Sequence, residues 1–317
     1  MSFLFPCIFK NMLYNNSKNT KVTINGGKNM QGNVMSFKAK INNISKEKKV
    51  APQSVLQIYM LERLLERISK SKYKDNFILK GGMLISAILG MSSRSTMDMD
   101  TTVKGFELTE ENAKKILNDI CEIELDDDIT FKMNKIELIR EDDDYNGYRA
   151  TFEAKFKNAM PVIFKVDITT GDAITYKEIE YDYNLMLEER KIPVWSYNIE
   201  TILAEKFEAI IKRGITGTRI RDFYDVYMLI NTQDDKINKK LLTVAINLTS
   251  EHRESVDLIK NWKSTLELLK TDEDMVKRWK VYQKTYFYAR EIEYDELMES
   301  IEKVGKIYDK YTSKVTM

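Results

Sequence analysis

Two aspartates that lie two positions apart are the first candidates for chemistry in this chain. Asp98 and Asp100 stand in the segment M-D-M-D-T, where polar and apolar residues alternate as they do in a half-buried β-strand. Their carboxylates therefore point to one side of the strand, where they would repel each other by about 4 kcal/mol at 4 Å and an effective dielectric near 20. A divalent cation relieves that repulsion, and Mg²⁺ prefers carboxylate oxygens, waters and substrate phosphates.

A glycine pair just upstream predicts a turn that binds phosphate. Gly81 and Gly82 follow a short apolar strand at 77–79 and begin a helix. Glycine lets the backbone approach a phosphate closely, and the free N–H groups at a helix start attract anions. The alternative is an ordinary strand-to-helix turn. Lys80 and Arg94 are further candidates for nucleotide binding, although Arg94 could instead anchor the loop.

A third carboxylate belongs to another predicted strand. Asp167 lies near the end of the β-branched and aromatic run at 162–168. Three acids from two strands are able to hold two Mg²⁺ ions about 4 Å apart, one activating an attacking hydroxyl and the other steadying a triphosphate. The competing interpretation is that Asp98 and Asp100 are solvated charges on a strand surface. A glycine turn beside a pair of metal-binding aspartates favours nucleotidyl transfer.

Composition narrows the class of protein. The chain has 317 residues, a formal net charge of +1, 43% hydrophobic and 31% charged residues, one histidine and two cysteines. Those counts disfavour histidine triads and multi-histidine zinc sites, and they fit a reducing cytoplasm. No apolar run is long enough to cross a bilayer, so we expect no membrane partner. A local basic patch remains compatible with RNA binding, and the basic, aromatic run at 277–284 would either contact RNA or pack as an amphipathic helix.

The elements that must position these residues predict an α+β fold in two parts. Residues 35–190 should form a nucleotidyltransferase-like domain with a mixed sheet and flanking helices, and 191–317 an all-helical domain. Helices are expected at 51–70, 83–89, 109–120, 199–213, 219–230, 239–248, 253–269, 274–290 and 295–311, and strands at 77–79, 135–140, 148–157 and 161–169 and around Asp98 and Asp100. Residues 1–34 should be a disordered extension, and the acidic triplets at 126–128 and 142–144 solvated turns.

The order of these motifs resembles a known superfamily. The glycine pair, then R-S-T-M-D-M-D at 94–100, then F-K-V-D-I at 164–168, resembles the DNA polymerase β-like nucleotidyltransferases. Farther along, E-T-I-L-A-E-K-F-E-A at 200–209 and R-I-R-D-F-Y-D-V-Y at 219–227 resemble two further motifs of the AbiEii/MenT toxin family. The resemblance covers residues 36–317. The chain departs from the family pattern at Gly82, where relatives have serine, and in a longer interval before Asp98.

The resemblance implies a toxin of a type IV toxin–antitoxin system that acts in abortive infection by phage. Such a toxin would be a Mg²⁺-dependent nucleotidyltransferase that moves NMP from an NTP, GTP or CTP, to RNA, in particular to the 3′ acceptor end of tRNA. An adjacent antitoxin, without direct contact to the toxin, would be its partner in the cytoplasm. The alternatives are a protein nucleotidylyltransferase and a GTP-binding growth inhibitor without RNA transfer.

The resemblance also implies roles for residues outside the carboxylate trio. Lys206 matches an essential lysine that contacts the β- and γ-phosphates; alone it would be read as a solvated helix lysine. Asp222 matches an essential acid, and Asp225, one helical turn later, is assigned to nucleotide binding. Without the resemblance, both aspartates would be interpreted as members of a surface salt-bridge cluster. Thr96 matches a hydroxyl phosphorylated in some relatives, or is a strand residue. The implied catalytic set is Asp98, Asp100, Asp167, Lys206 and Asp222.

Overall fold

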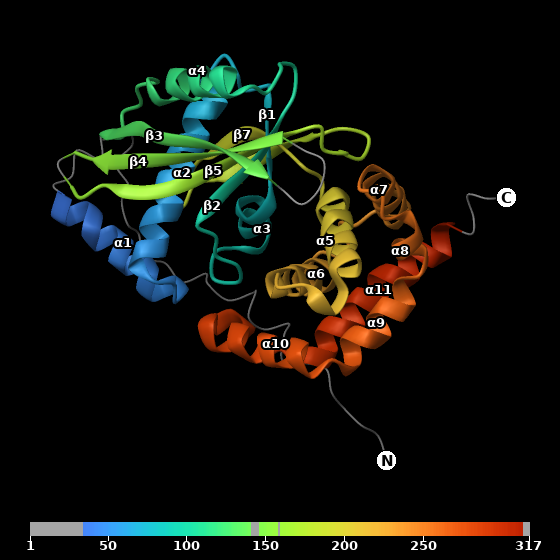
Figure 1. The fold of residues 1–317 in the computed structure, drawn as a ribbon. Coiled ribbons are helices and arrows are strands. Elements are labelled where there is room, and N and C mark those ends of the chain that lie inside the picture. Colours follow the sequence, from blue (N-terminus) through green and yellow to red (C-terminus); the bar gives the residue numbers. More distant parts are fainter. Residues whose placement is uncertain (1–33, 141–145, 158, 313–317) are drawn as a thin grey trace.

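The computed structural model describes residues 34–140, 146–157 and 159–312. The expectations for residues 1–33 and for the acidic triplet at 142–144 therefore lie outside the described residues. A twisted sheet fills one part of the molecule, and helices α5 to α11 gather beside it (Figure 1). The predicted mixed sheet with flanking helices, followed by an all-helical part, is confirmed. None of the described helices combines the length and the apolar character that crossing a membrane requires.

Seven strands form a single mixed sheet in the order β3-β4-β5-β2-β1-β7-β6. Two neighbouring pairs, β2 with β5 and β1 with β7, run parallel, while the other pairs are antiparallel. The strands are β1 (Phe77–Lys80), β2 (Asp98–Val103), β3 (Ile129–Arg140), β4 (Asn146–Phe156), β5 (Val162–Thr170), β6 (Ile179–Asn184) and β7 (Lys191–Ser196). The central strands β5, β2 and β1 carry the residues of interest, so their registers decide what the site contains.

Helices α1 (Val34–Lys48), α2 (Pro52–Lys70) and α4 (Glu110–Cys121) belong to the sheet-containing part. The helix α2 is buried along most of its length because its apolar positions recur at helical spacing and face the sheet. It is tied to the start of β3 by Arg67, whose guanidinium makes two hydrogen bonds with Asp127 at 2.8 and 2.9 Å. Asp127 lies in a turn as expected, but the expectation that it is solvated is wrong, because its side chain is buried against that arginine, whereas Asp126 and Asp128 are exposed.

The remaining helices follow the sheet in sequence, apart from α3 (Gly81–Leu89), which is inserted between β1 and β2. They are α5 (Ile199–Arg213), α6 (Ile220–Thr232), α7 (Lys239–His252), α8 (Val256–Lys260), α9 (Trp262–Thr271), α10 (Glu273–Thr285) and α11 (Tyr294–Thr312). Asn198 caps α5 by accepting the N–H of Thr201 at 2.8 Å, as its position before the helix predicts. The single helix expected at 253–269 is instead divided into α8 and α9 at Asn261.

Three of the described α-helices and strands were not anticipated from the sequence: α1, β6 and β7. The strand β7 runs to Ser196 and pairs with β1, so the sheet continues beyond the boundary expected at residue 190. The change from sheet to helix falls at Tyr197 and Asn198, immediately before α5. The backbone N–H of Tyr197 still donates to the carbonyl oxygen of Leu79 at 3.0 Å, which joins the residue before the N-cap of α5 to β1.

Candidate active site

A row of four charged side chains crosses the middle of the sheet. Lys80 on β1 is the register partner of Asp100 on β2, Asp100 is the partner of Asp167 on β5, and Asp167 is the partner of Arg149 on β4. Residues directly opposite each other on neighbouring strands share a face. The row therefore places two carboxylates between two cations on one face of the sheet, as the sequence predicted for Asp100 and Asp167.

Asp98 joins this face from the first position of β2. It stands two residues before Asp100 and therefore points to the same side of the strand. Its side chain is exposed, but loss of part of its hydration, followed by the negative charges of Asp100 and Asp167, raises the pKa of its carboxyl above the ordinary aspartate value. The three carboxylates share one face of the sheet, and the repulsion between their negative charges favours a bound cation.

The glycine turn lies directly beside Asp100. Gly81 has φ +62°, a left-handed conformation in which a side chain is strained, and a Cβ built there would lie 2.0 Å from Oδ2 of Asp100. The N–H of Gly82 donates to the same Oδ2 at 3.2 Å. The turn and the start of α3 therefore meet the carboxylate of Asp100 at contact distance. An anion bound at this helix start would lie next to whatever Asp100 holds.

A buried cluster connects the loop before β2 to the helical part. Arg94 donates from Nε and Nη2 to the two oxygens of Asp225 at 2.8 and 3.3 Å, and Lys206 lies 3.4 Å from Asp225 and also pairs with Asp222. Burial opposes ionisation of Asp225, but Arg94 and Lys206 outweigh it and lower the pKa of that carboxyl. Arg94 thus anchors its loop, the second of its two expected roles.

All four residues of this cluster therefore have charged partners inside the protein. Asp225 is fully buried, so the nucleotide-binding role expected for it would require the cluster to open. Lys206 retains some exposure, with 21% of its side-chain surface accessible. Its ammonium has a raised pKa because Asp222 and Asp225 outweigh the opposing effect of burial. Lys206 is therefore a fixed positive charge at the edge of the cluster.

Two further residues expected at the nucleotide are also engaged. The ammonium of Lys80 donates to Thr169 Oγ1 and to Asp172 Oδ2, both at 2.8 Å. The hydroxyl of Thr96 donates to the backbone oxygen of Asp98 at 3.2 Å, and the residue is buried at 4% exposure. The buried side chain of Thr96 therefore stabilises the start of β2. The loop that carries Thr96 would have to move before its hydroxyl could be modified.

The donors fit a divalent cation in kind, although they are not gathered around one point. Aspartate oxygens on a shared face are the ligands that Mg²⁺ prefers. Within the described residues, no three acidic, histidine or cysteine side chains form a group ready to hold a metal ion. Both oxygens of Asp167 contact Arg149. Asp98 and Asp100 therefore fit a divalent cation by the chemistry of their oxygens, whereas Asp167 fits once Arg149 releases it.

Sequence reasoning missed Arg149 and Asp172. The signal for Arg149 was present, because the strands predicted at 148–157 and 161–169 are separated by a short connection that makes an antiparallel hairpin. That hairpin pairs Phe152 with Phe164 and, farther from the turn, Arg149 with Asp167. Asp172 follows β5 in a loop, and no local pattern indicated that it would meet Lys80.

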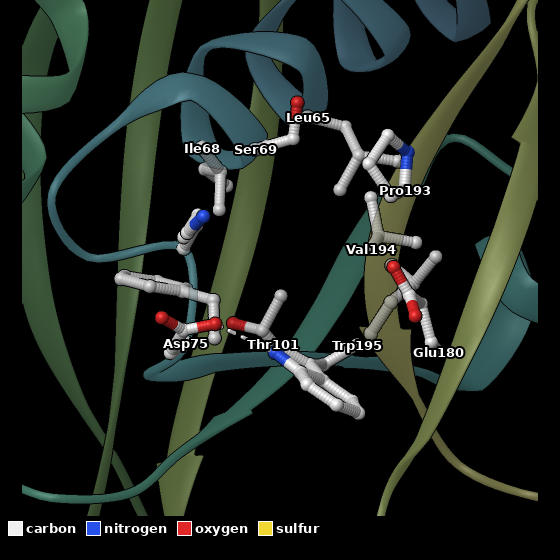
Figure 2. Close-up of a pocket in the computed structure, with 12 residues that line it drawn as sticks. Leu65, Ile68, Ser69, Asp75, Thr101, Glu180, Pro193, Val194 and Trp195 are labelled. Carbon is white, nitrogen blue, oxygen red and sulfur yellow. Dashed lines mark hydrogen bonds between the residues drawn. The ribbon is translucent and has the colours of Figure 1, made fainter.

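One hollow in the sheet region does not belong to the charged row. A cavity of about 120 Å³ lies between α2 and the sheet, and Figure 2 shows Leu65 and Ile68 of α2 facing Thr101 and Trp195 across it. Thr101 follows Asp100 on β2, so its side chain points to the opposite face. The cavity is therefore separated from the carboxylates by the sheet itself.

The basic, aromatic run at 277–284 forms most of α10. It packs as an amphipathic helix, which is one of the two interpretations predicted from the sequence. Trp279 and Tyr282 are buried at 1% and 6% exposure, and the indole N–H of Trp279 donates to the carbonyl of Ile292 at 2.9 Å. The lysines of this helix at 277, 280 and 284 stay exposed. Packing thus accounts for the aromatic residues and leaves the cations at the surface.

Comparison with known proteins identifies one family. The family model for the nucleotidyl transferase AbiEii toxin of type IV toxin–antitoxin systems matches residues 63–300. No curated protein matches the chain in sequence.

Three solved structures are similar in part. A Helicobacter pylori protein assigned as a nucleotidyltransferase has a TM-score of 0.48 and 14% identity, covering 83% of this chain and 98% of its own. The H. pylori protein JHP933 has a TM-score of 0.47 and 13% identity, covering 84% and 96%. An antigenic nucleotidyltransferase-like protein from Paracoccidioides brasiliensis has a TM-score of 0.36 and 15% identity, covering 64% and 93%.

Proposed function

The chain belongs to the AbiEii family of nucleotidyl transferase toxins from type IV toxin–antitoxin systems, and on that premise we propose that it transfers NMP from an NTP to RNA. The acceptor we propose is the 3′ end of tRNA, and the donor GTP or CTP. Membership in the family makes the chain a nucleotidyltransferase and implies an antitoxin partner. We expect that partner to act without direct contact to the toxin, in a system that aborts phage infection.

The observation that carries this proposal is the meeting of the carboxylates with the glycine turn. Asp98, Asp100 and Asp167 share one face of the sheet, and Gly81 approaches Asp100 so closely that no side chain would fit between them. A nucleotidyltransferase needs its metal ligands and its phosphate site adjacent, because the reacting phosphate must touch both. In this chain the neighbouring strands β2 and β5 and the start of α3 bring the metal ligands and the phosphate site together.

We assign the metal site to Asp98 and Asp100, with Asp167 as the third ligand. Bound Mg²⁺, two ions in our proposal, would supply Lewis-acid stabilisation of the triphosphate and would lower the pKa of the attacking hydroxyl. The protein contributes the geometry: β2 holds Asp98 and Asp100 two positions apart, and the register with β5 holds Asp167 opposite Asp100.

The protein's other groups would bind the triphosphate. The N–H groups at the start of α3 and the ammonium of Lys206 are the positive groups proposed for the phosphates, and Asp222 keeps Lys206 in place. In the reaction the 3′-hydroxyl oxygen forms a bond to the α-phosphorus while the bond from that phosphorus to the pyrophosphate oxygen breaks. The hydroxyl proton passes to a carboxylate of the trio, and pyrophosphate leaves.

An exposed aromatic ring between cations supports RNA as the acceptor. The side chain of Phe287 is 52% exposed, and Lys49 Nζ and the Arg290 guanidinium lie 4.7 and 5.1 Å from its ring centroid. The next residue, Tyr288, lies beside Ser95 in the loop that leads into β2. An unpaired base can stack on such a ring while the cations meet its phosphates.

The proposal is tested by growth and by labelling. Expression of the wild type should inhibit growth, and Asp98→Ala and Lys206→Ala should each relieve the inhibition while the protein remains folded. Purified wild type should incorporate α-labelled NTP into total RNA, and sequencing of the labelled 3′ ends should identify tRNA. Label found in protein instead would favour the protein nucleotidylyltransferase. Tight GTP binding without pyrophosphate release would favour the non-catalytic GTP-binding inhibitor.

A further inference from the structure

Arg149 holds the third carboxylate through both of its oxygens. Its Nε donates to Asp167 Oδ1 at 2.7 Å, and its Nη2 donates to Oδ2 at 2.6 Å. This is the two-point geometry in which a guanidinium binds a carboxylate most specifically. The Arg149 side chain nevertheless remains 42% exposed, whereas that of Asp167 is 16% exposed. The pair thus consists of a fixed anion on the sheet and a cation that can leave toward solvent.

Arg149 interacts with the whole carboxylate trio. The charges of Asp167, Asp98 and Asp100 all stabilise its guanidinium. The Arg149 guanidinium therefore already neutralises part of the negative charge that would bind a divalent cation. A cation that binds all three carboxylates has to displace Arg149 from Asp167.

We propose that Arg149 is a positioning residue that couples metal binding to nucleotide binding. In the nucleotide-free protein Arg149 occupies Asp167 and competes with the divalent cation for that carboxylate. The arriving triphosphate binds the guanidinium, Arg149 leaves Asp167, and the carboxylate becomes available to the metal. This inference rests on the proposed function, and it adds that the metal and the nucleotide bind cooperatively.

The exchange is physically accessible. An ion pair with a half-exposed arginine is weak compared with a buried one, because water and salt screen it. The planar guanidinium offers a phosphate the same two-point contact that it makes with Asp167, so its hydrogen bonds are exchanged without net loss. Linkage then requires reciprocity: if the nucleotide strengthens metal binding, the metal must strengthen nucleotide binding by the same factor.

The test is a Mn²⁺ titration followed by electron paramagnetic resonance. Wild type, Arg149→Gln and Lys165→Gln are titrated with and without each non-transferable α,β-methylene nucleoside triphosphate, and the signal of protein-free Mn²⁺–analogue mixtures is subtracted. Lys165 is the matched control because it is the register partner of Asp98 on β5, so the same charge is removed from the same face. The ion pair of Asp167 is made with Arg149, which holds both of its oxygens, so Lys165→Gln leaves that ion pair in place.

When no nucleotide is present, Arg149→Gln should bind Mn²⁺ about five- to tenfold more tightly than wild type. Adding the analogue should then strengthen Mn²⁺ binding by Arg149→Gln far less than it strengthens binding by wild type. Lys165→Gln should change the Mn²⁺ affinity by about twofold at most and keep the wild-type coupling. Equal behaviour of Arg149→Gln and Lys165→Gln would overturn the inference.

A third variant checks that Asp167 becomes a metal ligand. Asp167→Asn should weaken Mn²⁺ binding when the analogue is present, and an unchanged affinity there would also overturn the inference, since it would mean that Arg149 and Asp167 stay paired. The two proposals fail separately. Normal NMP transfer to RNA without the Mn²⁺ coupling rejects only the role of Arg149, and the Mn²⁺ coupling without transfer to RNA rejects only the proposed reaction.

Discussion

Replacement of Arg94 by methionine tests what holds the site together. Arg94 is 2% exposed and Asp225 is fully buried, and their two contacts of 2.8 and 3.3 Å join the loop before β2 to α6. Methionine keeps most of the side-chain volume but leaves Lys206, at 3.4 Å, as the ion-pair partner of Asp225 among the described residues. Breaking a buried ion pair from one side costs about 3–5 kcal/mol. Because Lys206 offsets part of that loss, we expect Arg94→Met to lower the free energy of unfolding by about 3 kcal/mol.

The assay is urea unfolding followed by tryptophan fluorescence. Arg290→Met serves as the control, because Arg290 is exposed and its contact with the ring of Phe287 should contribute less than about 1 kcal/mol. Adding Asp225→Asn to Arg94→Met should cost much less than the sum of the single changes, since the stranded charge is then removed. A loss below about 1 kcal/mol for Arg94→Met, or strict additivity of the two changes, would refute the reasoning.

Two further substitutions address the glycine turn and a buried acid. Gly81→Ala should displace the carboxylate of Asp100 and weaken Mn²⁺ binding, while Gly90→Ala, at φ +88° with no atom within 4 Å of the added Cβ, should leave Mn²⁺ binding intact. Equal Mn²⁺ affinities in the two variants, measured by the same titration, would contradict this account. Burial raises the pKa of Glu62 to about 8 from 4.5, so the folded protein retains a proton that the unfolded chain releases. Stability should therefore fall as pH rises from about 4.5 to 8, and Glu62→Gln should flatten that dependence in urea unfolding; a slope equal to that of wild type would count against it.

Local patterns were sufficient for the elements that carry the carboxylates. The alternation around Asp98 and Asp100 predicted a strand with both acids on one face, and β2 has that form. The cap at Asn198 and the stop at Gly214 defined α5 at both ends. These predictions succeeded because each depends only on residues that lie close together in the sequence.

The sequence did not reveal partners that only the folded chain brings together. The strand β7 joins β1 across more than a hundred residues, and its pairing leaves no local pattern. Arg94 and Asp225 are also far apart in sequence, so each looked like a candidate for the nucleotide, whereas together they form a buried anchor. Long-range pairing therefore decides which charged residues are free for a ligand, and residue type does not.

The most direct measurement of the central claim compares the fate of the α- and γ-phosphates of one NTP. Total RNA is incubated with the protein, Mg²⁺ and NTP labelled at either position, with Asp98→Asn and Asp100→Asn in parallel. The account predicts that the α-label enters RNA, that the γ-label leaves as pyrophosphate, and that both aspartate variants abolish transfer. Undiminished labelling by the aspartate variants, or entry of the γ-label into RNA, would contradict it.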